Sequence, residues 1–156
     1  MKKIILTLAI ACVFYAVPAF AQTTPAAPAA TADADREAIK QAALDYVEGW
    51  YEGNAERMER ALHPELAKRI VRTNEKGQSS LGQMSAMTLV QNVKRGGGKQ
   101  TPKERQQKDI TILDVFENAA CVKLVASDWI DYLQVAKFNG RWVIVNVLWE
   151  LKPEKK

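Results

Sequence analysis

The stretch DYLQVAKFNGRWVIVNVLWE, residues 131–150, decides the fold of this chain. Two runs of β-branched and aromatic residues flank Asn139-Gly140, a pair that favours the two-residue turn of a β-hairpin. This turn places Phe138 opposite Arg141, and the register of both strands follows by counting back. One face then carries Trp129, Asp131, Leu133, Val135, Trp142, Ile144, Asn146 and Leu148. The other face carries Ile130, Tyr132, Gln134, Ala136, Val143, Val145, Val147 and Trp149. Both faces are largely apolar, so we expect a sheet that is covered on each side, or covered on one side and dimerising on the other.

Three segments with the same β-strand character fill the region from residue 108 to the hairpin turn. They read KDITILDVFEN, AACVKLVASD and WIDYLQVAKF, and turn residues separate them. The C-terminal third is therefore predicted to be an antiparallel meander. Further upstream, LAKRIVRT at residues 66–73 is either a short strand or a turn.

The N-terminal half has a helical period instead. A helix is predicted from about Asp35 to Gly53, because apolar residues recur at helical spacing and glycine ends the pattern. Its apolar positions are Ile39, Ala43, Tyr46, Val47 and Trp50. The result is an amphipathic helix with an aromatic inner end.

Two shorter helices are predicted after it. Asn54 can cap a helix that ends near His63, because Pro64 disfavours helical geometry in the residue before it. A third helix is predicted over residues 85–95, with Ser85 or an earlier serine as the cap and glycines 96–98 as the terminator.

The first residues have the pattern of a secretory signal peptide. Two lysines precede a short apolar run that ends in Ala-Phe-Ala, which predicts cleavage after Ala21. Residues 22–34, rich in alanine, proline and threonine, are predicted to be a disordered tether. This leaves one folded domain, residues 35–152, located in the periplasm or outside the cell. No membrane span is expected after cleavage.

The charge and the cysteines of the cleaved chain exclude several classes of function. Of the 22 basic residues, 20 remain beside 18 acidic ones, so the charge does not indicate nucleic-acid binding. The basic loop at residues 94–108 contains no aromatic residue for base stacking, and it is either solvated or a contact for an anion. Cys121 remains as the single cysteine and is expected to be a small buried hydrophobe.

No metal or cofactor is expected either. One histidine and one remaining cysteine give no zinc-binding spacing. The segment GGGKQ at residues 96–100 lacks the serine or threonine of a phosphate-binding loop.

Two separated segments carry a resemblance to a known family. DYVEGWYEGNAERMERALHPEL, residues 45–66, has an aromatic helix end, a Gly-Asn junction and a His-Pro exit. Together with the final hairpin, it resembles the nuclear transport factor 2-like (NTF2-like) superfamily, and within it most closely the putative lumazine-binding family. The resemblance implies an α+β cone, with two to three N-terminal helices packed on a curved antiparallel sheet.

In that superfamily the first helix and the curved sheet enclose a pocket, and the enzymes among its members place a carboxylate or a histidine inside it. Such a carboxylate works as a base when an apolar wall raises its pKa. The hairpin register puts Asp131 and Asn146 on one face near Trp129. Tyr46 and Trp50 can close the pocket from the first helix. These five residues are the predicted ligand-binding set.

Asp131 and His63 are the two candidates for catalysis. Asp131 is either a general base or an exposed carboxylate outside the core. His63, the only histidine, either pairs with Asp131 or binds carbonyl groups at the helix end. Asn146 either contacts a ligand or satisfies the backbone. Met84 and Met87 either line the mouth of the pocket or pack against the core.

The leading interpretation is a non-catalytic domain that binds a small ligand or mediates association, and that forms a homodimer through its sheet. The alternative is a cofactor-independent isomerase, dehydratase or hydrolase with a pocket carboxylate. A third interpretation is a partner-binding module whose cone is filled by its own side chains. An enclosed polar cavity that contains Asp131 would favour the first two interpretations over the third.

Overall fold

The computed structural model describes residues 29–153, so the predicted signal peptide and residues 22–28 of the predicted tether lie outside the described residues. The first helix, α1 (Ala29–Glu52), starts earlier than expected. Residues 29–34, which were predicted to be disordered, form its first turns. The reason lies in their composition, because alanine is the strongest helix former and Pro28 is the last proline before this stretch.

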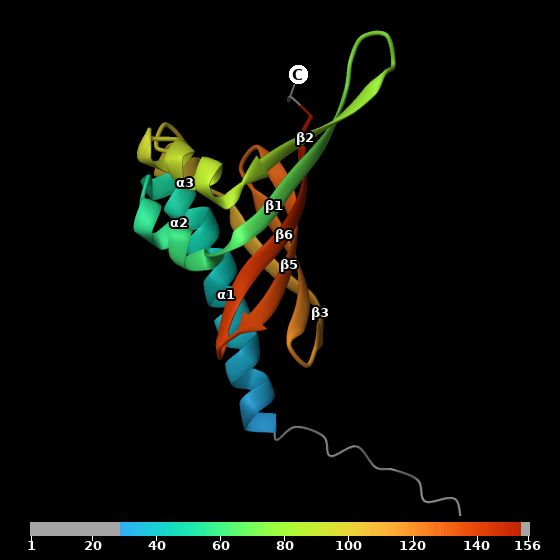
Figure 1. The fold of residues 1–156 in the computed structure, drawn as a ribbon. Helices are drawn as coiled ribbons and strands as arrows, with labels where there is room; N and C mark the ends of the chain where they lie inside the picture. Colours follow the sequence, from blue (N-terminus) through green and yellow to red (C-terminus); the bar gives the residue numbers. More distant parts are fainter. Residues whose placement is uncertain (1–28, 154–156) are drawn as a thin grey trace, which may run out of the picture.

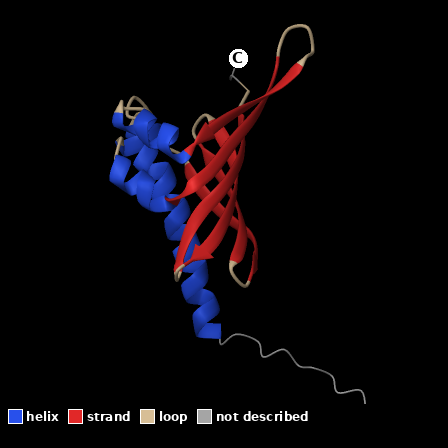
Figure 2. Cartoon of the chain, viewed as in Figure 1, coloured by secondary structure: helices blue, strands red, loops and turns tan. Residues whose placement is uncertain are grey.

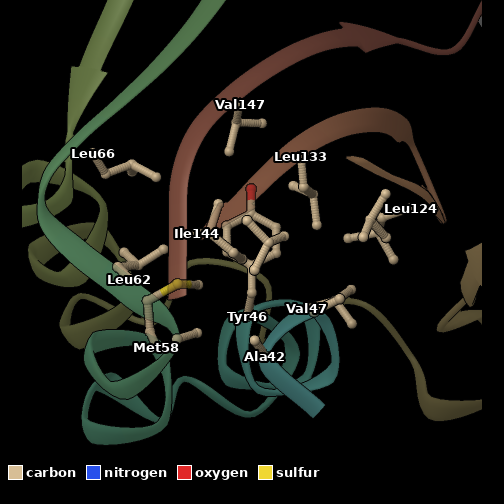
Figure 3. Close-up of a cluster of buried hydrophobic side chains, with 14 of the residues drawn as sticks. Ala42, Tyr46, Val47, Met58, Leu62, Leu66, Leu124, Leu133, Ile144 and Val147 are labelled. Atoms are coloured by element: carbon tan, nitrogen blue, oxygen red, sulfur yellow. The ribbon is translucent and has the colours of Figure 1, made fainter. Parts of the chain in front are cut away.

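Helix α1 packs on the sheet through one stripe of side chains. The buried positions recur every three to four residues and are Ile39, Ala42, Ala43, Tyr46, Val47 and Tyr51. The helix ends at Gly53, whose φ of +63° is in the left-handed region that glycine adopts without strain. Figure 3 shows Tyr46 rising from α1 toward the sheet, with its hydroxyl between the strands that carry Leu133 and Val147.

Two short helices lie beside the inner end of α1. Helix α2 (Ala55–Ala61) is capped by Asn54, and α3 (Ala86–Lys94) is capped by Ser85, as the sequence predicts. Figure 1 and Figure 2 show the described helices gathered on one side of the sheet. The predicted architecture of helices packed on a curved sheet is therefore confirmed.

The described strands form one six-stranded sheet in the order β2-β1-β6-β5-β4-β3. Their bounds are β1 (Leu62–Thr73), β2 (Ser79–Ser85), β3 (Lys108–Phe116), β4 (Ala119–Ala126), β5 (Trp129–Phe138) and β6 (Arg141–Leu151). The sheet is mixed rather than wholly antiparallel, because β1 and β6 run parallel. These two strands are distant in the sequence, so no hairpin turn fixes their relative direction.

The β5–β6 hairpin has the predicted turn, with Phe138 opposite Arg141, but its register changes halfway. Val135 pairs with Ile144, whereas the preceding residue, Gln134, pairs with Asn146. One extra residue, Val145, therefore bulges out of β6 and reverses the faces of everything after it. Beyond this bulge, the predicted faces are wrong: Val147 and Trp149 point toward the helices, and Asn146 and Leu148 point away.

Candidate functional site

A cavity of about 370 Å³ opens between the inner end of α1, α3 and the helix-facing side of the sheet. Aromatic and apolar side chains make up most of its wall. The lining residues are Tyr46, Trp50, Met58, Lys68, Met84, Leu89, Gly98, Gln100, Thr101, Asp128, Trp129, Trp149 and Leu151. A concave, mainly apolar space with a few polar groups is the usual form of a small-molecule site.

Tryptophans from three elements form the wall. Trp50 comes from the last turn of α1, and its ring meets Trp129 edge to face, with ring centroids 6.2 Å apart. The Tyr51 ring also packs against Trp129, with 5.9 Å between the ring centroids. Trp149 completes the wall from β6. The bulge at Val145 is what directs this last ring into the cavity.

The loop after α3 closes one side of the cavity. A Cβ atom on Gly97 would lie 2.7 Å from the Trp50 ring, and one on Gly98 would clash with the same indole. The glycine run therefore permits close approach to Trp50. The charged side chains of the basic loop at residues 94–108 are all exposed, which agrees with the solvated alternative for these residues.

A buried ion pair forms the floor. The ammonium of Lys68, from β1, donates hydrogen bonds to Asp131 Oδ1 and, at 2.7 Å, to the Tyr46 hydroxyl. The other oxygen of Asp131 accepts a hydrogen bond from Trp129 Nε1 at 2.6 Å. Lys68 is 5% exposed and Asp131 is fully buried, so the pair is shielded from solvent.

Two aromatic faces also hold the Lys68 ammonium. Its nitrogen lies 4.6 Å from the centre of the Trp149 ring and 5.4 Å from the centre of the Tyr46 ring. Both contacts are within the range of cation–π attraction. The carboxylate and these rings together offset the cost of burying a charge in an apolar floor.

Burial changes the pKa of both Lys68 and Tyr46. Burial lowers the pKa of Lys68, while the neighbouring Asp131 charge opposes that change. Burial raises the pKa of Tyr46 well above its ordinary value, and the negative charge of Asp131 acts in the same direction. Tyr46 is therefore a neutral phenol at physiological pH.

The structure places three of the five predicted ligand-binding residues on the cavity wall: Tyr46, Trp50 and Trp129. Asp131 lies beneath the wall, on the inner face of β5, and does not line the cavity. Asn146 is on the opposite face of the sheet, where its amide donates to Gln134 Oε1 at 2.9 Å. The prediction that Asn146 and Asp131 share a face is wrong because of the bulge.

His63 is not near Asp131. Its ring packs against Phe138 with 4.5 Å between centroids, and its Nδ1 accepts a hydrogen bond from the Glu65 main chain. Phe138 and Asp131 are seven residues apart on one strand, which is about 23 Å. The geometry excludes a His63–Asp131 dyad.

Lys68 and Trp149 are the two residues around the buried ion pair that the sequence analysis missed. Leu66, Lys68 and Ile70 are all buried and share one face of β1, so a lysine at an apolar position of an alternating strand was the available signal. Trp149 was assigned to the outer face because a single bulged residue leaves no clear pattern in the sequence.

Three further expectations concern individual residues. Met84 lines the cavity, whereas Met87 is largely exposed and lies outside it. The expectation of a buried Cys121 is wrong: its thiol is exposed, on the sheet face away from the helices, because β4 alternates and only its even-numbered neighbours face the core.

Within residues 29–153, no group of three histidine, cysteine or acidic side chains is placed to hold a metal ion. Over the same residues, no helix combines the length and apolar character needed to cross a bilayer.

A cavity between a long first helix and one face of a curved sheet defines the NTF2-like class of proteins. Solved structures of this class are similar to the chain. An NTF2-like protein of unknown function from Methylobacillus flagellatus has a TM-score of 0.62 and 20% sequence identity, over 77% of this chain and 94% of its own. An NTF2-like protein with a cystatin-like fold from Novosphingobium aromaticivorans has a TM-score of 0.60 and 11% identity, over 81% and 88%.

The solved structure of an enzyme is also similar to the chain. The hexachlorocyclohexane dehydrochlorinase of Novosphingobium barchaimii has a TM-score of 0.56 and 11% identity, over 81% of this chain and 92% of its own. At such identities the likeness shows the fold alone.

Residues 34–150 match the model of the family described as putative lumazine-binding. The chain belongs to this family, as the sequence resemblance predicted. A comparison with curated proteins found no match.

Proposed function

We propose that this protein binds a small, mainly apolar ligand in the tryptophan-lined cavity and does not catalyse a reaction on it. The family's description as lumazine-binding supports a small-molecule ligand. The aromatic rings of Trp50, Trp129 and Trp149 supply broad apolar contact area at low entropic cost, since each side chain has only two rotatable bonds.

The observation that carries this proposal is the state of Asp131. A general base needs an oxygen within reach of the substrate proton. Both oxygens of Asp131 accept hydrogen bonds from neighbours, and the side chain is fully buried behind Lys68 and Trp129. This arrangement supports binding over the alternative, an isomerase, dehydratase or hydrolase with a pocket carboxylate.

The cavity volume also weighs against the third interpretation, a cone filled by its own side chains. A space of about 370 Å³ is within the size range of small-ligand sites. It is much larger than the packing defects of ordinary cores, which rarely exceed a water molecule.

Native mass spectrometry of the purified protein, before and after unfolding, tests the proposal. We expect a small molecule to be released on unfolding and its binding to be lost in Trp149→Ala. Asn146→Ala is the matched control, because Asn146 lies on the same strand but on the opposite face. Equal binding by both variants, or turnover of the released compound by the wild type, would contradict the proposal.

We also propose that the protein acts in the periplasm or outside the cell. The support is the signal-like pattern of residues 1–21 in the sequence. N-terminal sequencing of the protein from its natural host checks this. A chain that begins at Gln22 is expected, and retention of Met1 in the cytoplasm would contradict it.

Finally, we propose a homodimer that pairs the sheet faces turned away from the helices. The support is a shallow apolar groove on this face, to which Leu113, Tyr132 and Leu148 contribute half-exposed side chains. Light scattering after gel filtration should give twice the chain mass, and Leu148→Glu should give the monomer. A monomeric wild type would refute the dimer without affecting the proposed binding.

A further inference from the structure

The floor of the cavity combines a hydrogen-bond donor with zero net charge. Lys68 is a buried lining residue, and its ammonium carries three N–H groups. Among the described residues it has two hydrogen-bond acceptors, Asp131 and Tyr46. The third N–H has no acceptor among the described residues, and the Lys68 nitrogen lies 4.6 Å from the centre of the Trp149 ring in the cavity wall.

We infer that the ligand of this cavity presents an uncharged acceptor oxygen, such as a ketone, ester or amide carbonyl, to the Lys68 ammonium. This inference rests on the proposed ligand binding and names the chemical class of the ligand. An apolar body against the three tryptophans and a carbonyl at the floor together describe that class.

Charge balance selects a carbonyl over a carboxylate. The positive charge of Lys68 is already cancelled by Asp131, which is buried directly beneath the floor. A carboxylate ligand would add an uncompensated negative charge to an apolar, water-poor space, and burying such a charge is costly. A carbonyl oxygen accepts the same hydrogen bond without adding charge.

The residues at the mouth of the cavity also disfavour an anionic ligand. Asp128 lines the mouth of the cavity and adds negative charge there. None of the lysines and arginines of the loop at residues 94–108 belongs to the lining, although Gln100 and Thr101 of that loop do. The loop can attract anions to the surface, but no second cation reaches the floor.

Three probes that share a naphthalene ring distinguish a carbonyl ligand from a hydrocarbon and from a carboxylate. They are 2-acetylnaphthalene, 2-ethylnaphthalene and 2-naphthoate. Isothermal titration calorimetry of the wild type is expected to show the ketone binding about tenfold more tightly than the hydrocarbon, since a hydrogen bond to a charged donor is worth at least this much. The naphthoate is expected to bind at least tenfold more weakly than the ketone.

A double variant, Lys68→Met with Asp131→Leu, removes the donor and keeps the floor uncharged. Its affinities for the ketone and for 2-ethylnaphthalene should differ by less than about twofold, so that the tenfold preference of the wild type is lost. Infrared spectroscopy of 2-acetylnaphthalene bound to the wild type gives a second reading that needs no variant. Its carbonyl stretch should lie at a lower frequency than in hexane, because the oxygen accepts a hydrogen bond.

The possible results are distinguishable. Equal affinity for the ketone and the hydrocarbon, or an unshifted carbonyl stretch, would overturn the inference and leave the proposed binding function intact. Tightest binding of the naphthoate would overturn it in favour of an anionic ligand. Failure of all three probes to bind would count against the inference and the proposed function together.

Discussion

Replacing Lys68 by methionine should strongly destabilise the fold, because it leaves the Asp131 carboxylate buried without its counter-charge. The side chains of the pair are 6% and 0% exposed, so water cannot replace the lost partner. Breaking a buried pair in this way costs about 3–5 kcal/mol. For a domain of this size, that lowers the melting temperature by roughly 10–25 °C.

The double variant Lys68→Met with Asp131→Leu provides the contrast. When both charges are replaced by apolar side chains of similar volume, the loss of unfolding free energy is expected to fall well below the sum of the two single variants, because the desolvation cost disappears with the attraction. The loss that remains comes from Trp129 Nε1 and the Tyr46 hydroxyl, which no longer have their hydrogen-bond partners. Thermal and denaturant unfolding of the wild type, both single variants and the double variant give the coupling energy of the pair.

Lys76→Met is the matched control, since Lys76 is exposed in the turn between β1 and β2. It should change stability by no more than about 0.5 kcal/mol. The reasoning would be refuted if Lys68→Met cost less than about 1 kcal/mol, or if the double variant were as unstable as the sum of the two single variants.

Three further predictions concern stability. Because burial, together with the Asp131 charge, raises the pKa of Tyr46 above 10.0, unfolding free energy should fall as pH rises above about 10, and Tyr46→Phe should flatten that fall in alkaline titrations. Gly98→Ala should lower the unfolding free energy clearly more than Gly77→Ala does in denaturant melts. Both glycines have positive φ, so both variants are strained, but only a Cβ on Gly98 would also clash with Trp50; equal losses would exclude the close contact. Although burial opposes it, hydrogen bonds from two arginines of α2 lower the pKa of Asp45, so Asp45→Asn should destabilise the protein at pH 7 and differ less from the wild type as pH falls through 4.

The fold was accessible from the sequence because its local signals agree with one another. The helical spacing around Tyr46, the caps Asn54 and Ser85 and the turn at Asn139-Gly140 are each decided within a few residues. The parallel pairing of β1 and β6 was not accessible, since it depends on contacts between distant segments.

The site was accessible only in part, for a related reason. Tyr46, Trp50 and Trp129 were found because they follow the helical period or lie on the predicted face of the hairpin. Lys68 was missed because one lysine in a short, ambiguous segment carries no sign that its partner is a carboxylate 63 positions later. Trp149 was missed because the bulge at Val145 changes the register of β6, and the prediction assumed a regular register.

The bulge at Val145 has a consequence for how the contents of this pocket can change. A substitution alters one wall residue, whereas the bulge sets the faces of the whole outer half of β6. A regular hairpin of the same length would pair Leu133 with Asn146 and Asp131 with Leu148, which would turn Asn146 and Leu148 inward and send Trp149 to the surface. Deleting Val145 would instead remove only the extra residue, because Gln134 could still pair with Asn146 and Val135 with Ile144, and Trp149 would stay inside. A shift of register that loses the bulge, rather than a change of chain length at Val145, would therefore give the same scaffold a different pocket chemistry.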